Sequence, residues 1–305
     1  MGTPEFAVPS LDILVKEGYE VAAVVTQPDK PKGRGNKMAA PAVKEYAARK
    51  GIPVLQPAKI KTQEFAEELK SLKPDLLVTV AYGKILPDYV LDIPPLGCIN
   101  VHGSLLPQYR GAAPIQWSVI NGEKVTGITT MYTDIGMDTG DMLVKKEVEV
   151  PEDMTAGELH DVLSVVGAEV LKDTLEKLEK GILERTPQPH DQATYAAMMT
   201  KELGRIDWSK SAREIHNLVR GTNPWPGAYS FYKGERIRIW KTSVISGKAL
   251  NYKPGTICEV IKSGVVVATG DGLLNIVEVQ FDSSRRMAVE EYMRGHSIDE
   301  GEVLG

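Results

Sequence analysis

Apolar segments rich in β-branched residues alternate with segments of helical periodicity through the first two-thirds of this 305-residue chain. The expected strands are Val21–Thr26, Pro53–Leu55, Asp75–Ala81, Cys98–Val101 and Thr126–Tyr132. The expected helices are Ser10–Glu17, Pro41–Lys50, Gln63–Leu72 and Ala112–Ile120. This alternation predicts an α/β fold: a mostly parallel sheet with helices on both faces. In such sheets, ligands bind beyond the carboxyl ends of the strands.

The pattern changes after residue 185. Met142–Val150 is expected to be an antiparallel strand, and a long helix runs from Thr155 to about Lys180. The polar, proline-bearing stretch 186–206 is then typical of a linker between a first domain, 1–185, and a second, 207–305. The second domain is expected to hold one helix, Ala212–Arg220, and the short strands Tyr229–Tyr232, Ile237–Val244, Gly255–Ile261, Val265–Thr269 and Leu273–Val279. Five short strands with glycine turns predict a small barrel of the oligonucleotide-binding (OB-like) type.

Composition excludes several classes of protein. No apolar run approaches 18 residues and the N-terminus lacks a secretory signal, so we expect neither a membrane span nor export. Cys98 and Cys258 lie far apart, which favours two free thiols and a cytoplasmic location. The five histidines show no paired ligand spacing, so no metal is expected. Dinucleotide and ATP fingerprints are both missing from the sequence.

The charge is unevenly distributed along the chain. The net charge is −5, but residues 206–289 carry 12 Lys and Arg against 7 Asp and Glu, which leaves +5. Residues 1–205 carry 23 against 29, which leaves −6. The second domain could therefore present a basic face to a nucleic acid, although a difference of this size also arises by chance.

Asn100 and His102 are the first candidates for chemistry. Two residues apart on a strand, their side chains point to the same side. They lie at a strand end before an irregular loop that contains Gly103 and Pro107. An amide and an imidazole there could both reach one carbonyl oxygen and stabilise its developing charge. The alternative is a strand-end asparagine that caps a turn and a histidine satisfied in the core.

Asp138 is the candidate carboxylate. It lies between Gly136 and Gly140 in a loop, and it could stabilise a protonated His102 or position a water for proton relay. Asp134 and Asp141 compete for the same role. A solvated turn aspartate is the structural alternative.

A basic loop follows the first expected strand. Lys30, Lys32, Arg34 and Lys37 stand against one acid, Asp29, in the run 27–37. Such a run is usually only solvated, but beside a cleft it could bind a phosphate backbone.

The run Cys98-Ile99-Asn100-Val101-His102-Gly103-Ser104-Leu105-Leu106-Pro107, continued by Gln108-Tyr109-Arg110-Gly111-Ala112-Ala113-Pro114, resembles the signature of the formyltetrahydrofolate-dependent formyltransferases. Supporting stretches extend almost from end to end. They include Gly2-Thr3-Pro4-Glu5-Phe6, Ala81-Tyr82-Gly83-Lys84-Ile85-Leu86-Pro87, Met137-Asp138-Thr139-Gly140-Asp141 and Asn223-Pro224-Trp225-Pro226-Gly227. The basic loop and the second domain resemble the family members that act on initiator tRNA.

The resemblance implies a Rossmann-like catalytic domain and a C-terminal barrel that helps to bind tRNA. A monomer is the default expectation. The resemblance also implies that Asn100, His102 and Asp138 are catalytic, with 10-formyltetrahydrofolate as the co-substrate. The residues implied for the folate site are Tyr82, Gly83, Ile85, Leu86, Ser104, Leu105, Leu106 and Pro107. Lys30, Lys32, Arg34 and Lys37 match the family loop that enters the acceptor stem of the tRNA.

The implied reaction is formyl transfer to the α-amino group of methionine esterified to initiator tRNA. Three alternatives stay open: transfer to a small amine such as glycinamide ribonucleotide or an amino sugar, hydrolysis of formyltetrahydrofolate, and a non-catalytic nucleic-acid-binding protein. One departure from the family pattern stands out. Family members have a strand before the Gly2-Thr3-Pro4 turn, and here only Met1 precedes it, so the first strand of the sheet is expected to be missing.

Overall fold

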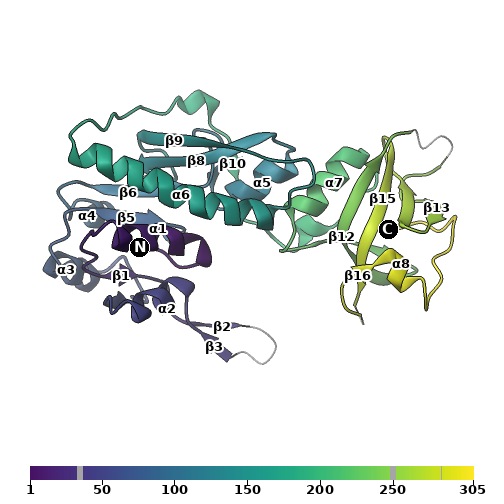
Figure 1. Ribbon diagram of the computed structural model, residues 1–305, viewed down its shortest axis with the longest axis horizontal. Helices are drawn as coiled ribbons and strands as arrows, with labels where there is room; N and C mark the ends of the chain where they lie inside the picture. The colour runs from purple at the N-terminus through teal and green to yellow at the C-terminus, as the bar shows by residue number, and fades with distance from the viewer. Residues whose placement is uncertain (33–36, 248–251, 283) are drawn as a thin grey trace. The chain divides into compact units, whose positions relative to one another are not determined.

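The computed structural model describes residues 1–32, 37–247, 252–282 and 284–305. The chain forms two compact units (Figure 1). The first contains Met1–Pro114, Val125–Glu149 and His160–Ala197, and the second contains Ile115–Lys124, Val150–Leu159 and Met198–Gly305. Each unit has its own sheet and is described separately.

The main sheet of the first unit has the strand order β5-β6-β8-β9. Its strands are β5 (Leu77–Val80), β6 (Cys98–His102), β8 (Val125–Tyr132) and β9 (Met142–Glu149). β5 and β6 are parallel, whereas β8 is antiparallel to both β6 and β9. The prediction of a mostly parallel sheet is therefore correct only in part. The chain between β6 and β8 does not return to the start of β6, as a parallel crossover would.

Helices cover this sheet. They are α1 (Val8–Lys16), α2 (Ala42–Arg49), α3 (Gln63–Ser71), α4 (Asp88–Leu91) and α6 (Ala156–Glu179). α6 runs along the sheet (Figure 1), and Gly167 lets its backbone approach β6 and β8 closely. A Cβ atom at Gly167 would lie 3.2 Å from Val101 and 3.7 Å from Ile128. The α/β architecture predicted from the sequence is thus confirmed.

A second, parallel pair of strands consists of β1 (Val24–Val25) and β4 (Val54–Leu55). Met1 and Gly2 lie between β1 and β5: the Gly2 amide donates to the Val25 carbonyl at 3.0 Å, and the Val80 amide donates to the Met1 carbonyl at 2.9 Å. Met1 and Gly2 thus bridge β1 and β5 through backbone hydrogen bonds. Gly2 is required there, because a Cβ atom would lie 2.9 Å from the Val80 carbonyl oxygen.

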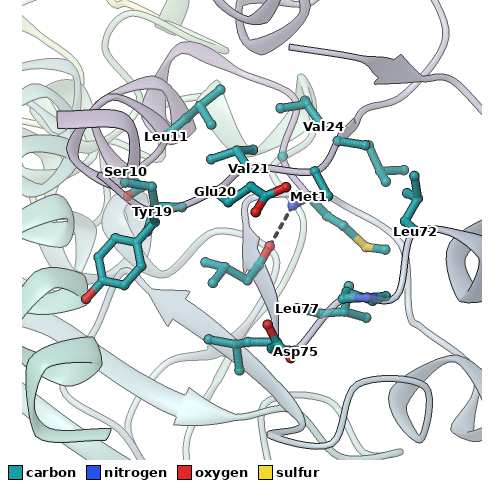
Figure 2. Close-up of a pocket in the computed structure, with 18 of the residues that line it drawn as sticks. Met1, Ser10, Leu11, Tyr19, Glu20, Val21, Val24, Leu72, Asp75 and Leu77 are labelled. Carbon is teal, nitrogen blue, oxygen red and sulfur yellow. Dashed lines mark hydrogen bonds between the residues drawn. The ribbon is translucent and has the colours of Figure 1, made fainter. Parts of the chain in front are cut away.

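A cavity of about 530 Å³ lies beside Met1 and Gly2. Figure 2 shows Leu11, Val24, Leu72 and Leu77 around it. The Met1 amine donates to the Val78 carbonyl at 2.6 Å at its edge. The strand expected over 21–26 is observed over two residues only, and residues 21–23 line this cavity.

The second unit contains α5 (Pro114–Ile120), α7 (Ala212–Gly221), α8 (Val289–Tyr292) and an antiparallel sheet. The sheet order is β11 (Ala228–Tyr232), β12 (Glu235–Ile245), β15 (Leu273–Phe281), β14 (Gly264–Ala268) and β13 (Ile257–Ile261), with β16 (Met287–Ala288) beside β15. Within the described ranges β11 and β13 do not pair, so the sheet is not closed. A separate C-terminal β domain is present, and its OB-like character stays a prediction.

The stretch 186–206 is more ordered than a linker needs to be. β10 (Tyr195–Ala196) pairs in parallel with β7 (Arg110–Gly111), and Thr186 exchanges two backbone hydrogen bonds with Met142. Residues up to Ala197 group with the first unit. This attachment brings the stretch against the loops that follow β6 and β8.

No helix in the described part of the chain is long and apolar enough to cross a membrane.

Candidate active site

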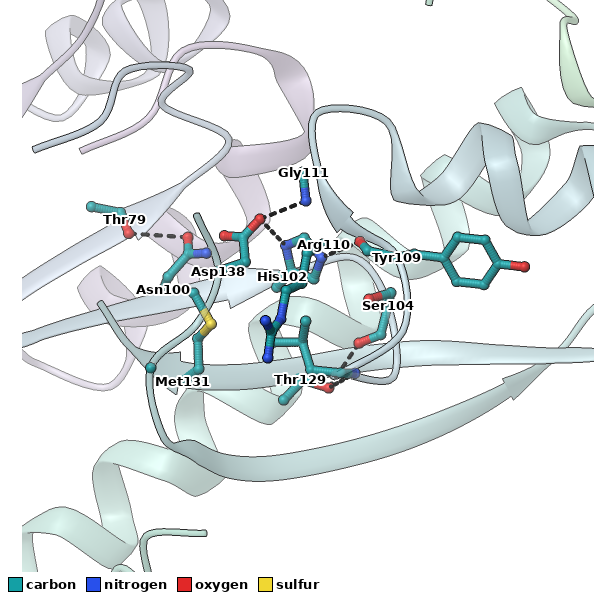
Figure 3. Close-up of polar contacts among 12 residues, drawn as sticks. Thr79, Asn100, His102, Ser104, Tyr109, Arg110, Gly111, Thr129, Met131 and Asp138 are labelled. Carbon is teal, nitrogen blue, oxygen red and sulfur yellow. Dashed lines mark hydrogen bonds and ion pairs between the residues drawn. The ribbon is translucent and has the colours of Figure 1, made fainter. Parts of the chain in front are cut away.

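β6 presents Asn100 and His102 on one side at its carboxyl end, as the spacing predicts (Figure 3). The Asn100 side-chain oxygen accepts a hydrogen bond from the Thr79 hydroxyl at 3.0 Å. This contact fixes the amide orientation, so that Nδ2 is the end left to donate. Among the residues described, Nδ2 has no protein partner, and Asn100 is only half-buried. A hydrogen-bond donor is therefore available to a ligand.

His102 is buried and held by two contacts. Nε2 lies 2.9 Å from the Tyr109 carbonyl oxygen, and Nδ1 lies 3.6 Å from Oδ2 of Asp138. A carbonyl can only accept, so Nε2 carries a hydrogen and donates it. Nδ1 is then the nitrogen that can gain or lose a proton, and it faces the carboxylate (Figure 3).

Asp138 has a backbone φ of +54°, a left-handed conformation that is uncommon outside glycine. Its Oδ2 accepts a hydrogen bond from the Gly111 amide at 2.8 Å as well as facing His102. The competing aspartates lie elsewhere. Asp134 accepts from Gly136 and Thr139 within its own turn, and Asp141 lies 3.4 Å from Arg185. Of the three candidate aspartates, Asp138 is the one whose carboxylate faces His102 in the described residues.

The loop after β6 is held in place by polar contacts. The Thr129 hydroxyl donates to the Ser104 carbonyl at 2.7 Å and accepts from the Leu106 amide at 3.1 Å. Lys145 donates to the Leu106 carbonyl at 2.5 Å, and burial lowers the pKa of its amine. Ser104 and Leu106 are buried, whereas Leu105 and Pro107 are half-buried. Leu105 and Pro107 are therefore the more accessible of the four predicted folate residues in this loop.

The second segment predicted to bind folate, residues 82–86, also contains both buried and exposed residues. Tyr82 and Leu86 belong to a buried apolar cluster, while Gly83 and Ile85 are exposed. The Tyr82 carbonyl accepts from Gln27 Nε2 at 2.9 Å, which ties the segment to the end of β1. Tyr82 and Leu86 therefore support the segment, and Gly83 and Ile85 form its surface.

The basic loop is a hairpin of β2 (Lys30–Lys32) and β3 (Lys37–Ala39). Lys32 pairs with Lys37 in its register, and Lys30 donates to Gln27 at 2.9 Å. Arg34 lies outside the described residues. The hairpin brings Lys30 and Lys37 onto neighbouring strands of one projecting element.

Two buried polar residues beside the site were not assigned from the sequence. Arg110 is 2% exposed and Gln188 is 4% exposed, and the two are hydrogen-bonded. Gln188 lies in the stretch expected to be a linker. The prolines on either side of it restrict the backbone there and were the available signal.

No group of three or more metal-ligating side chains occurs in the ranges that the structure describes.

Comparison with known proteins places the chain in a family. The formyl transferase model matches residues 1–175, and the model of the formyl transferase C-terminal domain matches residues 198–297. Methionyl-tRNA formyltransferase of Acetivibrio thermocellus is 68% identical over 305 residues, covering 100% of this chain and 98% of the relative. Methionyl-tRNA formyltransferase of Ruminiclostridium cellulolyticum is 62% identical over 306 residues, with the same shares covered.

Solved structures share the fold at low identity. An N-formyltransferase from Helicobacter canadensis, in complex with folinic acid and dTDP-3-aminofucose, superposes with a TM-score of 0.68 at 21% identity, over 90% of this chain and 96% of that one. HypX from Aquifex aeolicus, in complex with tetrahydrofolic acid, gives 0.58 at 19% identity, over 83% of this chain and 47% of that one. With both domain models matched and close relatives aligned over its whole length, this chain belongs to the formyl transferase family.

Proposed function

We propose that this enzyme transfers the formyl group of 10-formyltetrahydrofolate to the α-amino group of methionine esterified to initiator tRNA. The observation that carries the proposal is the convergence of Asn100, His102 and Asp138 at the end of β6. The acceptor is proposed because full-length relatives at 62% and 68% identity are methionyl-tRNA formyltransferases.

The three side chains have separate roles in this reaction. The neutral amine attacks the formyl carbon, the carbon–N10 bond breaks, and one amine proton ends on N10 of the folate. Asn100 Nδ2 donates a hydrogen bond to the formyl oxygen while that oxygen carries negative charge, and a protonated His102 adds a nearby positive charge. Asp138 faces His102 Nδ1 and relays the proton, directly or through a water.

The folate donor is proposed to lie against Ile85, Leu105 and Pro107. These apolar side chains are accessible, and the neighbouring backbone is fixed by contacts to Gln27, Thr129 and Lys145. Apolar walls with a few fixed polar groups suit a flat heteroaromatic ring system. Ser104, Leu106, Tyr82 and Leu86 are assigned a supporting role, because their side chains are buried.

The tRNA is proposed to contact the β2–β3 hairpin and the second unit. Lys30, Lys32, Arg34 and Lys37 supply positive charge to the acceptor stem, and residues 206–289 carry a net +5. The C-terminal sheet would act as an OB-like nucleic-acid surface. We propose that the enzyme acts in the cytoplasm as a monomer.

Formyl transfer from radiolabelled 10-formyltetrahydrofolate tests the proposal. Three acceptors are compared in parallel: methionyl-initiator tRNA, free methionine and glycinamide ribonucleotide. Product on the tRNA alone supports the proposal. Product on a small amine alone would assign the chain to that reaction instead, and folate release without any formylated acceptor would indicate a hydrolase.

A further inference from the structure

We propose that Gln188 is a positioning residue that holds the Asp138 loop in its catalytic conformation. The inference rests on the function proposed above for Asp138. It concerns a glutamine in the stretch that the sequence predicts to be a linker, about fifty positions from the loop on which it acts.

Gln188 uses both ends of its amide. Nε2 donates to the backbone carbonyls of Asp138 at 2.9 Å and of Gly140 at 2.7 Å. Oε1 accepts from two nitrogens of Arg110, Nε at 3.0 Å and Nη2 at 2.6 Å. These four contacts use both N–H donors and both oxygen lone pairs of the amide, and they leave a single amide orientation possible.

The contacts form a closed ring around Asp138. Arg110 holds Gln188, and Gln188 holds the Asp138 backbone. The next residue after Arg110, Gly111, donates its amide to the Asp138 carboxylate at 2.8 Å. The Asp138 side chain is therefore held directly by β7, through Gly111. The Asp138 backbone is held by β7 indirectly, through Gln188 and Arg110. The left-handed φ of +54° at Asp138 is a conformation that needs such external support.

The chemistry of the partners explains why the residue is an amide. A buried arginine is commonly paired with a carboxylate, but in the described residues Arg110 forms no ion pair with an acid. A carboxylate could accept from Arg110 and could not donate to two carbonyls. An amide does both, so its chemistry suits a residue that holds Arg110 and the Asp138 loop together.

The variant Gln188→Glu distinguishes two roles of Gln188: holding the Asp138 loop in position, and accepting hydrogen bonds from Arg110. The introduced carboxylate pairs with Arg110 but opposes the carbonyls of Asp138 and Gly140. If Gln188 positions Asp138, kcat falls by about tenfold to a hundredfold, as expected for a catalytic group displaced by a fraction of an ångström to 1 Å, while KM for both substrates changes little. Gln192→Glu is the matched control, because it adds the same charge on an exposed side chain four positions away.

A double-mutant cycle asks whether Gln188 acts through Asp138. Adding Gln188→Glu to Asp138→Asn should lower kcat no further, because the group being positioned is already removed. Full additivity, or a near-normal kcat in Gln188→Glu alone, would overturn the inference.

Hydrogen exchange gives a readout that does not depend on turnover. Amides of residues 134–141 should exchange faster in Gln188→Glu than in the wild type and in Gln192→Glu. Unchanged exchange would refute the positioning role even if the acceptor proposed for the enzyme proves wrong. The wild type could instead fail to transfer a formyl group while Gln188→Glu still shows the expected faster amide hydrogen exchange. That result would refute only the proposed function.

Discussion

The Nε2 atom of His102 lies 2.9 Å from the carbonyl oxygen of Tyr109, and this contact decides which imidazole nitrogen faces Asp138. Because the carbonyl holds a hydrogen on Nε2, proton exchange is confined to Nδ1, 3.6 Å from the carboxylate. The tautomer is set by the loop that follows β6. Catalysis is therefore expected to depend on that loop as well as on the three side chains.

Asn100→Ala should lower kcat by roughly a hundredfold to a thousandfold, or about 3 kcal/mol of barrier, because it removes the donor to the developing oxyanion. Binding of tRNA should persist, which filter binding would measure. Thr79→Val is a graded control: it frees the amide to rotate without removing it, and we expect a smaller loss. Near-normal turnover of Asn100→Ala would exclude the assigned role.

Asp138→Ala should abolish turnover while tRNA binding survives, because His102 loses its acidic partner. Single-turnover formylation with saturating tRNA measures the chemical step. Asp134→Ala is the matched control, since that carboxylate contacts only its own turn among the described residues. If both variants lose activity equally, the loop as a whole is required and the specific role of Asp138 is refuted.

Arg34→Ala and Lys37→Ala should raise KM for tRNA and reduce the salt dependence of tRNA binding, because each removes a positive charge that is proposed to contact a phosphate. The rate with limiting tRNA, measured between low and moderate salt, reports this change. Lys180→Ala, on an exposed side chain directly after α6, is the control for charge alone. An unchanged rate at limiting tRNA would exclude the hairpin from recognition.

The stability of the chain that begins at Met1 should rise between about pH 6 and pH 8. Burial lowers the pKa of the Met1 amine from 8.0 to about 6, so between these values the unfolded chain binds more protons than the folded one. The free energy of unfolding should increase by about 2 to 3 kcal/mol over this range from this group alone. Urea unfolding at several pH values measures it.

A chain extended ahead of Met1 by five apolar residues is the control for that experiment. The extension replaces the amine by a peptide group, so no titrating amine remains at the Val78 carbonyl. We expect this chain to lose the pH dependence. An identical pH profile in the extended chain would show that another group is responsible.

The sequence by itself determined the elements of the fold that depend on local pattern. Apolar runs between turn signals located β5, β6 and β9 to within about two residues, and periodicity located α6 and α7 equally well. The spacing of Asn100 and His102 put both on one side of β6, since side-chain direction on a strand repeats every two residues. These features are decided by neighbours along the chain.

Only the tertiary structure decided the remaining features. The direction of β8, the shortening of β1 and the open path of the C-terminal sheet depend on which strands become neighbours. The choice of Asp138 over Asp134 depends on its distance to His102, and the burial of Gln188 depends on Arg110, 78 positions away. The sequence pattern indicates whether a residue fits the helix or strand in which it lies. Contacts between distant segments depend on how the whole chain packs, and packing determines which polar groups must satisfy one another.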